Sequence, residues 1–382
     1  MGEHTGAFQD MLEALERFAS ENIAPREDLG SSTEFPFDLW KRMGEEGLLG
    51  ASVPEEYGGS GLGYGAISRL AMALARRGGC LGIVLSWLMH QIACRFVMAG
   101  MASKDLMDTY LPGLAAGEAT VSIAISEPKT GAHPRHMETR AEKTARGYLV
   151  SGEKAFLTNG PIASLFVVVA VTKTEGGLKS FSSMVVRRET EGLEVLPPLD
   201  VGFLHPCPHG AITMDRCAVG EDHVLGRPHK AYEDLVVPFR LVEDVCLMGM
   251  LIGSARSRLD DIVSKLRDRG TAPGEEVVFS LGGLESSLRA IEVLASEAAR
   301  ILDADGPAAE IRPLVLAFRS LFSEIHKGTG LLYGVAGVTP SQQALTMGKD
   351  LDALGGFASR VARRTQVKIG SGMLGGVSRV DI

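Results

Sequence analysis

The hydrophobic pattern divides the chain into two helical regions separated by a region typical of strands. In residues 8–25, apolar side chains recur at spacings of three and four, and Pro25 ends the run. The same period continues over residues 36–49, 65–78, 83–100 and 103–116. The pattern therefore predicts an N-terminal α domain over residues 1–117.

After Gly117 the pattern changes to short runs rich in β-branched residues. Examples are "SLFVVVAVTK" and "SFSSMVVRR", and Gly, Pro, Asn and Asp divide such runs as far as about residue 228. Short strands with turn residues between them are typical of an antiparallel barrel or sandwich. We therefore expect a middle β domain over residues 118–228.

The helical period returns in the last third of the chain. It covers residues 232–266, 275–303, 310–333 and 341–366. Long helices joined by short connections predict a bundle over residues 229–382. The order of helices, strands and helices indicates an α+β protein, and it disfavours a doubly wound nucleotide-binding fold, which needs alternating strands and helices.

Composition excludes several classes of function. The chain has 382 residues and a net charge of −8, with Lys and Arg scattered along it, so no nucleic-acid or anionic-membrane surface is indicated. The five cysteines show neither CxxC spacing nor a zinc-ligand pattern, which predicts no metal site and favours a reducing cytoplasm. We expect no signal peptide and no membrane span, because no stretch has 18 uninterrupted apolar residues.

A glycine-rich stretch, "PEEYGGSGLGYG" at residues 54–65, suggests a phosphate-binding loop at first sight. It lacks the G-x-G-x-x-G spacing and no strand precedes it. A tight turn between helices is the better interpretation.

Two neighbouring acids interrupt the apolar stretch "RLVEDVCLMGMLIGSAR" at residues 240–256. They are Glu243 and Asp244, and Arg240 lies three and four residues before them, within reach of an ion pair on one helix face. A charge removed from water is costly unless it is paired or neutralised. The acids therefore either form structural ion pairs or have a chemical role, and spacing alone leaves both open.

Three stretches resemble the acyl-CoA dehydrogenase family of flavoproteins. They are "EEGLLGASVPEEYGGSGLG", "AISEPKTGAHPRHMETRAEK" and "GYLVSGEKAFLTNGPIAS", and the ending "DHVLG" is also similar. The resemblance covers nearly the whole chain and weakens after residue 260. It implies an N-terminal helical domain, a middle β-barrel or sandwich and a C-terminal four-helix bundle. It also implies FAD between the β domain and the bundle, in a homotetramer or homodimer.

The resemblance implies FAD contacts on the middle domain. Ser126 replaces a threonine that hydrogen-bonds the isoalloxazine edge, Thr158 matches the second hydroxyl, and Phe156 stands where a tryptophan usually lies against the ring. A phenylalanine keeps an apolar, π-bearing wall. Ile125 and Gly131 belong to the same expected site. Without the resemblance, both hydroxyls would be ordinary strand residues.

Further cofactor contacts are implied in the bundle. Arg267 stands where the family extends an arginine to the FAD pyrophosphate of the neighbouring subunit, although the accompanying Phe and Gln are absent. A surface charge is the alternative for Arg267. Gly355 and Gly356 match the family's glycines, with a shorter loop after them than usual.

The catalytic base that the resemblance implies does not lie where most family members carry it. Most family members carry a glutamate after the last bundle helix, but the corresponding stretch "RRTQVKIGSGML" has Ser371 there. The isovaleryl-CoA and long-chain branch places its glutamate on the first bundle helix, ten residues before a glycine. Counting back from Gly253 gives Glu243. Asp244 occupies the position of an arginine in that branch, and Arg240 can pair with it and leave Glu243 free.

The resemblance thus predicts FAD-dependent α,β-dehydrogenation of an acyl thioester, carried by CoA or by a carrier protein, with an electron-transfer flavoprotein as electron acceptor. Glu243 is the expected base, because burial raises the pKa of a carboxyl toward neutrality. Ala132, Asp244 and Leu247 are the expected substrate contacts. Two alternatives remain: a flavin-dependent oxygenase or oxidase of the same fold, and an inactive partner subunit of a heteromeric dehydrogenase.

Overall fold

A computed structural model describes residues 3–129 and 131–373, and all statements below concern these residues. The N-terminal region contains the helices α1 (Glu3–Phe18), α2 (Phe37–Glu45), α3 (Tyr64–Gly78), α4 (Leu81–Ile92) and α5 (Lys104–Ala115). Two of them continue as π-helices, η1 (Ala19–Ile23) after α1 and η5 (Ala93–Ala99) after α4. These helices confirm the periodic runs predicted for this part of the chain.

Helix α4 with its extension η5 is long and apolar enough, by length and composition alone, to cross a membrane. Most of this stretch, Leu81–Ala99, is buried inside the protein, where Trp87 and Leu88 are fully covered. It therefore packs as a core helix, and its apolar side chains contact other helices of the same chain.

The middle region forms one eight-stranded sheet. Its strands are β1 (Val121–Ala124), β2 (Arg140–Thr144), β3 (Gly147–Thr158), β4 (Leu165–Glu175), β5 (Leu178–Arg187), β6 (Leu193–Val195), β7 (His209–Gly220) and β8 (Val224–Leu225). The strand order is β6-β7-β3-β2-β4-β5-β8, and β1 pairs with β4. The expected antiparallel pairing holds for most neighbours, but β4 runs parallel to both β1 and β2.

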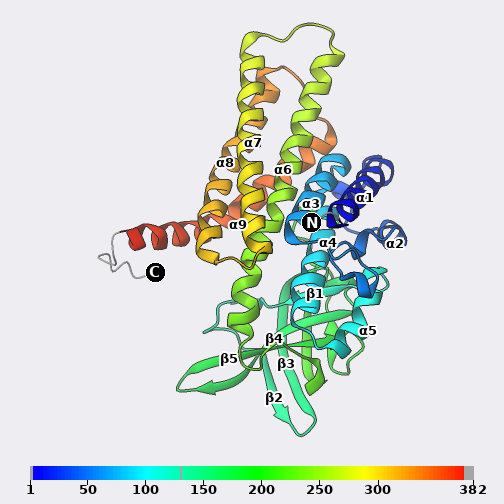
Figure 1. Cartoon of the computed structure of the whole chain (residues 1–382), viewed down its shortest axis with the longest axis vertical. Coiled ribbons are helices and arrows are strands. Elements are labelled where there is room, and N and C mark those ends of the chain that lie inside the picture. The colour runs from blue at the N-terminus through cyan, green and yellow to red at the C-terminus, as the bar shows by residue number, and fades with distance from the viewer. Residues whose placement is uncertain (1–2, 130, 374–382) are drawn as a thin grey trace.

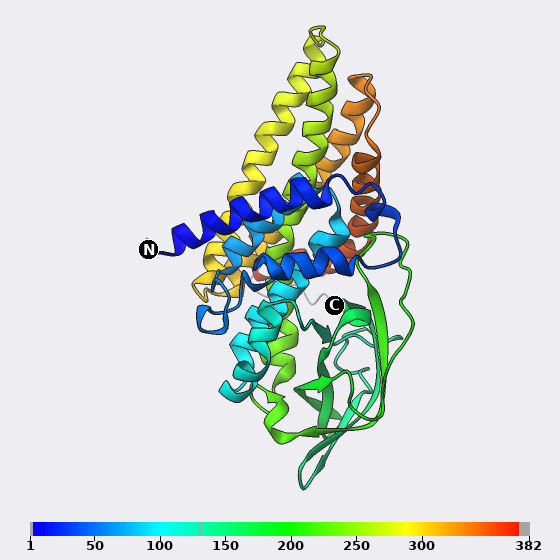
Figure 2. The ribbon, with the colours of Figure 1, turned by 90° about the vertical axis from the view of Figure 1, so that its right-hand side faces the viewer.

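The C-terminal region contains α6 (Val237–Asp268), α7 (Glu275–Asp303), α8 (Ala308–Val335) and α9 (Gln342–Met373). Helices α6, α7 and α8 lie side by side at one end of the molecule and the sheet lies at the other, with the N-terminal helices beside their junction (Figure 1, Figure 2). Helix α9 runs across this group and its last turns project away from it (Figure 1). The four expected helices are present, but only three are aligned.

One expectation about α9 is wrong. The short loop expected after Gly355 and Gly356 does not exist, because both glycines lie inside the continuous helix α9, which extends to Met373. Several of the residues that follow Gly356, such as Ala358, Ala362 and Arg363, are good helix formers, and no proline interrupts the stretch. The segment around Ser371 therefore belongs to the same helix.

Close contact between α3 and α6 sets the rotation of α6. A Cβ atom added at Gly249 would overlap the carbonyl oxygen of Ser68, and one added at Gly253 would overlap that of Met72. Glycine at both positions lets the two backbones touch. With 100° of rotation per residue, Glu243 lies roughly 100° around α6 from this α3 contact, and Asp244 lies roughly 160° from it, on the side of α8.

The glycine-rich stretch at residues 54–65 forms a tight turn, as predicted. Gly58 and Gly61 adopt positive φ angles of 86° and 61°, and the Leu62 amide donates to the Ala51 carbonyl at 3.0 Å. The turn leads into α3, whose first amides at Tyr64 and Gly65 donate to the Asp303 carboxylate.

Candidate active site

Glu243 is a partly buried carboxyl on α6 that has no ionic partner. Within the described residues it forms neither a hydrogen bond nor an ion pair. Burial raises the pKa of Glu243 to about 7, and the neighbouring charge of Asp244 acts in the same direction, while Arg240 and Arg319 oppose it. A carboxyl that titrates near neutral pH is suited to accept a proton.

Asp244 differs from its neighbour because it is paired twice. Its Oδ1 atom lies 2.6 Å from Nη2 of Arg319 on α8 and 3.6 Å from Nε of Arg240. Burial raises the pKa of Asp244, and the two arginines oppose that effect. The predicted ion pair with Arg240 is confirmed. The second partner, Arg319, lies 75 residues away in sequence, and no local pattern indicated it.

A cavity of about 480 Å³ lies between α6, α8 and α9. Three of the residues predicted to bind substrate or cofactor line it, namely Asp244, Leu247 and Gly355, and Arg319 lines it as well. Leu247 lies one turn after Glu243 on the same side of α6. Much of the remaining wall is apolar, from side chains such as Met248, Leu251, Phe318, Phe322 and Leu354. The cavity thus adjoins Asp244 and begins one helical turn after Glu243, which does not line it.

A second group of predicted residues lies on the sheet. The amide of Ala155 donates to the carbonyl of Ser126 at 2.9 Å, which joins the segment after β1 to β3. Neither the Ser126 nor the Thr158 hydroxyl has a hydrogen-bond partner among the described residues, although the Thr158 carbonyl accepts from Ser122 at 2.8 Å. Both hydroxyls are partly exposed. Both hydroxyls are therefore available to a ligand.

Phe156 lies two residues before Thr158 on an irregular part of β3. Its side chain is 59% exposed, and its φ angle of +59° is unusual for a phenylalanine. A break in the pairing register between β3 and β7 at Ala155 and Leu157 accommodates this conformation. A large exposed ring beside two unused hydroxyls fits the edge and face of a planar cofactor such as FAD.

A buried ion pair underlies this group, and the sequence analysis missed it. The Lys154 ammonium donates to Glu127 Oε1 at 3.1 Å and to the carbonyl of Ile125 at 2.9 Å. Glu127 also accepts from the amides of Glu138 and Thr139. Burial lowers the pKa of Lys154 to about 8, and Glu127 opposes that effect. Glu127 and Lys154 lie 27 residues apart, and no local pattern indicated their pairing.

The predicted contacts Gly131 and Ala132 lie in the turn that follows Ser126. Gly131 has a φ angle of +57°, and its amide and carbonyl exchange two hydrogen bonds of 3.0 Å with Glu127. Ala132 is exposed. This turn therefore begins at the buried ion pair and presents Ala132 to solvent.

Arg267 is far from the sheet in this chain. It is exposed near the C-terminal end of α6, at the end of the molecule opposite the strands (Figure 1). The described chain does not bring it together with Ser126, Phe156 and Thr158. Gly356 lies in α9, next to the cavity residue Gly355.

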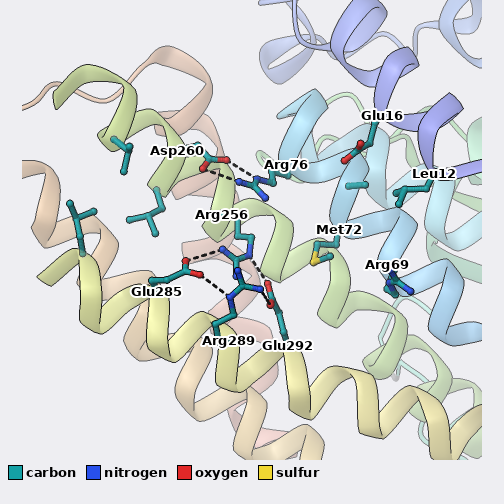
Figure 3. Close-up of a pocket in the computed structure, with 14 residues that line it drawn as sticks. Leu12, Glu16, Arg69, Met72, Arg76, Arg256, Asp260, Glu285, Arg289 and Glu292 are labelled. Atoms are coloured by element: carbon teal, nitrogen blue, oxygen red, sulfur yellow. Dashed lines mark hydrogen bonds and ion pairs between the residues drawn. The ribbon is translucent and has the colours of Figure 1, made fainter. Parts of the chain in front are cut away.

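A larger cavity of about 590 Å³ lies between α1, α3, α6 and α7 and contains none of the predicted residues (Figure 3). Its charges are largely paired with one another. Arg256 points between Glu285 and Glu292, and Arg76 pairs with Asp260 at 2.7 Å (Figure 3). These contacts join α6 to α7 and α3, and they account for the arginines as structural residues.

Comparison with known proteins agrees with this arrangement. Residues 5–118 match the N-terminal domain of acyl-CoA dehydrogenases, and residues 122–217 match their middle domain. The chain is 36% identical over 241 residues to an L-prolyl-(peptidyl-carrier protein) dehydrogenase of Pseudomonas fluorescens, a match that covers 62% of this chain and 63% of that protein. It is 33% identical over 262 residues to a mitochondrial isovaleryl-CoA dehydrogenase of Arabidopsis thaliana, covering 67% and 63%. The matches thus span under two thirds of these relatives' lengths.

The fold is also that of a solved relative. A glutaryl-CoA dehydrogenase in complex with glutaryl-CoA superposes with a TM-score of 0.83 over 97% of this chain and 95% of its own, at 22% identity. The predicted resemblance and the predicted three-part fold are confirmed, and FAD is the cofactor that goes with them. The chain belongs to the acyl-CoA dehydrogenase family.

Proposed function

We propose that this protein oxidises an acyl thioester to its α,β-unsaturated form, with Glu243 as the base that removes the α-proton. The observation that carries the proposal is the contrast between two adjacent acids. Asp244 is bound by two arginines, whereas Glu243 has no ionic partner, has a pKa raised to about 7 and lies one helical turn before Leu247, which lines a largely apolar cavity. In this pair only Glu243 is free to accept a proton from a substrate.

Ser126, Phe156 and Thr158 would hold the flavin edge on the sheet side. When bound, FAD supplies the acceptor for the hydride that leaves the β-carbon. The remaining chemistry belongs to the chain: the Glu243 carboxylate takes the α-proton, and the electron pair of that C–H bond forms the new double bond. Burial keeps the Glu243 carboxyl poorly solvated and its pKa high.

The thioester is carried by a pantetheine arm, of CoA or of a carrier protein. Similar proteins include both kinds by name, an isovaleryl-CoA dehydrogenase and an L-prolyl-(peptidyl-carrier protein) dehydrogenase. The apolar cavity favours an acyl group without a net charge at its buried end. We further propose an electron-transfer flavoprotein as the electron acceptor and a homo-oligomeric assembly.

The test is reduction of the bound flavin without oxygen. Purified holoenzyme is mixed with a panel of acyl-CoA thioesters and acyl-carrier-protein thioesters, and the visible flavin absorbance is followed. We expect bleaching with at least one thioester, and a loss of at least about a thousandfold in rate in Glu243→Gln. The matched control is Glu276→Gln, because Glu276 is exposed and forms no ion pair in the described part of the chain.

Two results would contradict the proposal. Unchanged bleaching in Glu243→Gln would exclude Glu243 as the base. If no thioester bleached the flavin while chemically reduced enzyme reacted rapidly with oxygen, the oxygenase alternative would be correct.

A further inference from the structure

The starting observation is the pairing of Arg319 with Asp244 across the interface of α8 and α6. The Nη2 to Oδ1 distance is 2.6 Å, and the two side chains are 23% and 13% exposed. Arg240, the second partner, is 51% exposed and lies farther away, at 3.6 Å. Water screens the Arg240 contact more strongly, so the Arg319 contact is the stronger of the two.

We propose that Arg319 is a positioning residue for the base, an inference that rests on the role proposed for Glu243. Consecutive residues of a helix point about 100° apart, so Asp244 faces α8 while Glu243 faces the neighbouring side. Arg319 holds the Asp244 carboxylate on the α8 side and compensates its charge. Without Arg319, an uncompensated negative charge would stand next to Glu243.

The charged groups nearest to Glu243 come from two helices. Arg240 and Asp244 come from α6, and Arg319 comes from α8. Glu324, His326 and Lys327 of α8 line the same cavity as Asp244 and Arg319. The Cys246 thiol, one turn after Glu243, is influenced by Arg95 of η5 and Asp303 of α7. On the α3 side the nearby titratable group is Tyr64, and α9 presents Gly355 and Gln366 to the cavity.

Two single substitutions should therefore act in opposite directions. Arg319→Met leaves the Asp244 charge less compensated and makes ionisation of Glu243 harder. Asp244→Asn removes that charge and frees both arginines to stabilise ionised Glu243. In the double variant Arg319→Met, Asp244→Asn, both effects are removed together, so it should behave more like the wild type than either single variant does.

The readout is the pH dependence of anaerobic flavin reduction in single turnover, measured on holoenzyme with a thioester that bleaches the wild type. We expect the acid limb of the profile to move up by about one pH unit in Arg319→Met and down by about one unit in Asp244→Asn. The double variant should lie within about half a unit of the wild type. Arg319→Lys keeps the charge and should restore most of the wild-type profile.

Thermal unfolding and FAD content of each variant are measured in parallel, so that loss of folding is separated from a shifted profile. If Arg319→Met does not fold, the opposite shift in Asp244→Asn and its cancellation in the double variant still test the proposal. Limbs that do not move, or that move in the same direction, would overturn it. If Glu243→Gln abolishes bleaching but the limbs stay fixed, only the role of Arg319 fails. If Glu243→Gln bleaches normally, the proposed base fails instead.

Discussion

The buried ammonium of Lys154 binds the two residues that flank Ser126 in the sequence: it donates to the carbonyl of Ile125 at 2.9 Å and to the carboxylate of Glu127 at 3.1 Å. The next residue, Ala155, donates its amide to the carbonyl of Ser126 itself at 2.9 Å. Two consecutive residues of β3 therefore hold three consecutive residues of the segment expected to contact FAD. The arrangement links the stability of the sheet to the geometry of the cofactor site.

Lys154→Met should destabilise the protein and weaken FAD binding. The substitution leaves the Glu127 carboxylate buried without its cation, which typically costs about 3–5 kcal/mol. Chemical denaturation of the apoprotein measures the first effect, and quenching of flavin fluorescence on binding measures the second. Lys173→Met is the control, because Lys173 and its partner Glu175 are both exposed, and the free energy of unfolding should change by less than about 1 kcal/mol. Equal changes in the free energy of unfolding and in FAD affinity for Lys154→Met and Lys173→Met would contradict this role of the Lys154–Glu127 pair.

Phe156→Ala should separate cofactor binding from folding. The ring is 59% exposed, so its removal should change the free energy of unfolding of the apoprotein by less than about 1 kcal/mol. If the ring lies against the flavin, FAD affinity should fall by roughly tenfold, as expected for a lost aromatic contact. Leu178→Ala, at a position that is 79% exposed on β5, serves as the control and should leave FAD affinity unchanged. Unaltered FAD affinity in Phe156→Ala would remove this residue from the site.

The raised pKa of Glu243 predicts a pH-dependent effect on stability. A carboxyl with a pKa of about 7 in the folded protein and 4.5 in the unfolded chain favours folding below pH 4.5, and this contribution is lost as the pH rises to 7. The glutamine in Glu243→Gln does not titrate, so the variant does not lose stability in this way. Its free energy of unfolding relative to that of the wild type should therefore increase between pH 5 and pH 8. At about 1.4 kcal/mol per pH unit, the gain is at most roughly 3 kcal/mol. Denaturation midpoints at several pH values measure it, and a difference that is independent of pH would show that the pKa of Glu243 is not raised.

The contact between α3 and α6 can be tested with two glycines. Gly249→Ala should destabilise the protein by about 1–3 kcal/mol, because the new methyl group would overlap the carbonyl oxygen of Ser68. Gly282→Ala on α7 is the control: nothing lies within 4 Å of a Cβ at that position, so it should stabilise the protein by about 0.5–1 kcal/mol through helix propensity. Thermal unfolding of both variants provides the measurement. Stabilisation by Gly249→Ala would mean that the helices are farther apart than described.

Much of the architecture could be predicted because it depends on local periodicity. The spacing of apolar residues located the helices to within a few residues, and β-branched runs divided by turn residues located the strands. The direction of β1 relative to β4 was not predictable in this way, because it depends on which strands become neighbours. The period predicted a helix over residues 341–366, which the structure confirms, and only the loop that the resemblance implied after Gly355 and Gly356 was wrong.

The candidate site divides in the same manner. The sequence by itself predicted the pairing of Asp244 with Arg240, because the two residues lie one turn apart on a single helix. The role of Glu243 came from the resemblance to the family and stays a prediction. Only the tertiary structure supplied Arg319, which reaches Asp244 from another helix, and the Lys154–Glu127 pair, whose partners lie on different segments of the sheet region. The cavity beside Leu247 likewise exists only where α6, α8 and α9 meet. Helical and strand periods depend on residues that are close in the sequence. Ion pairs between elements and the walls of a cavity depend on packing between segments that are distant in the chain.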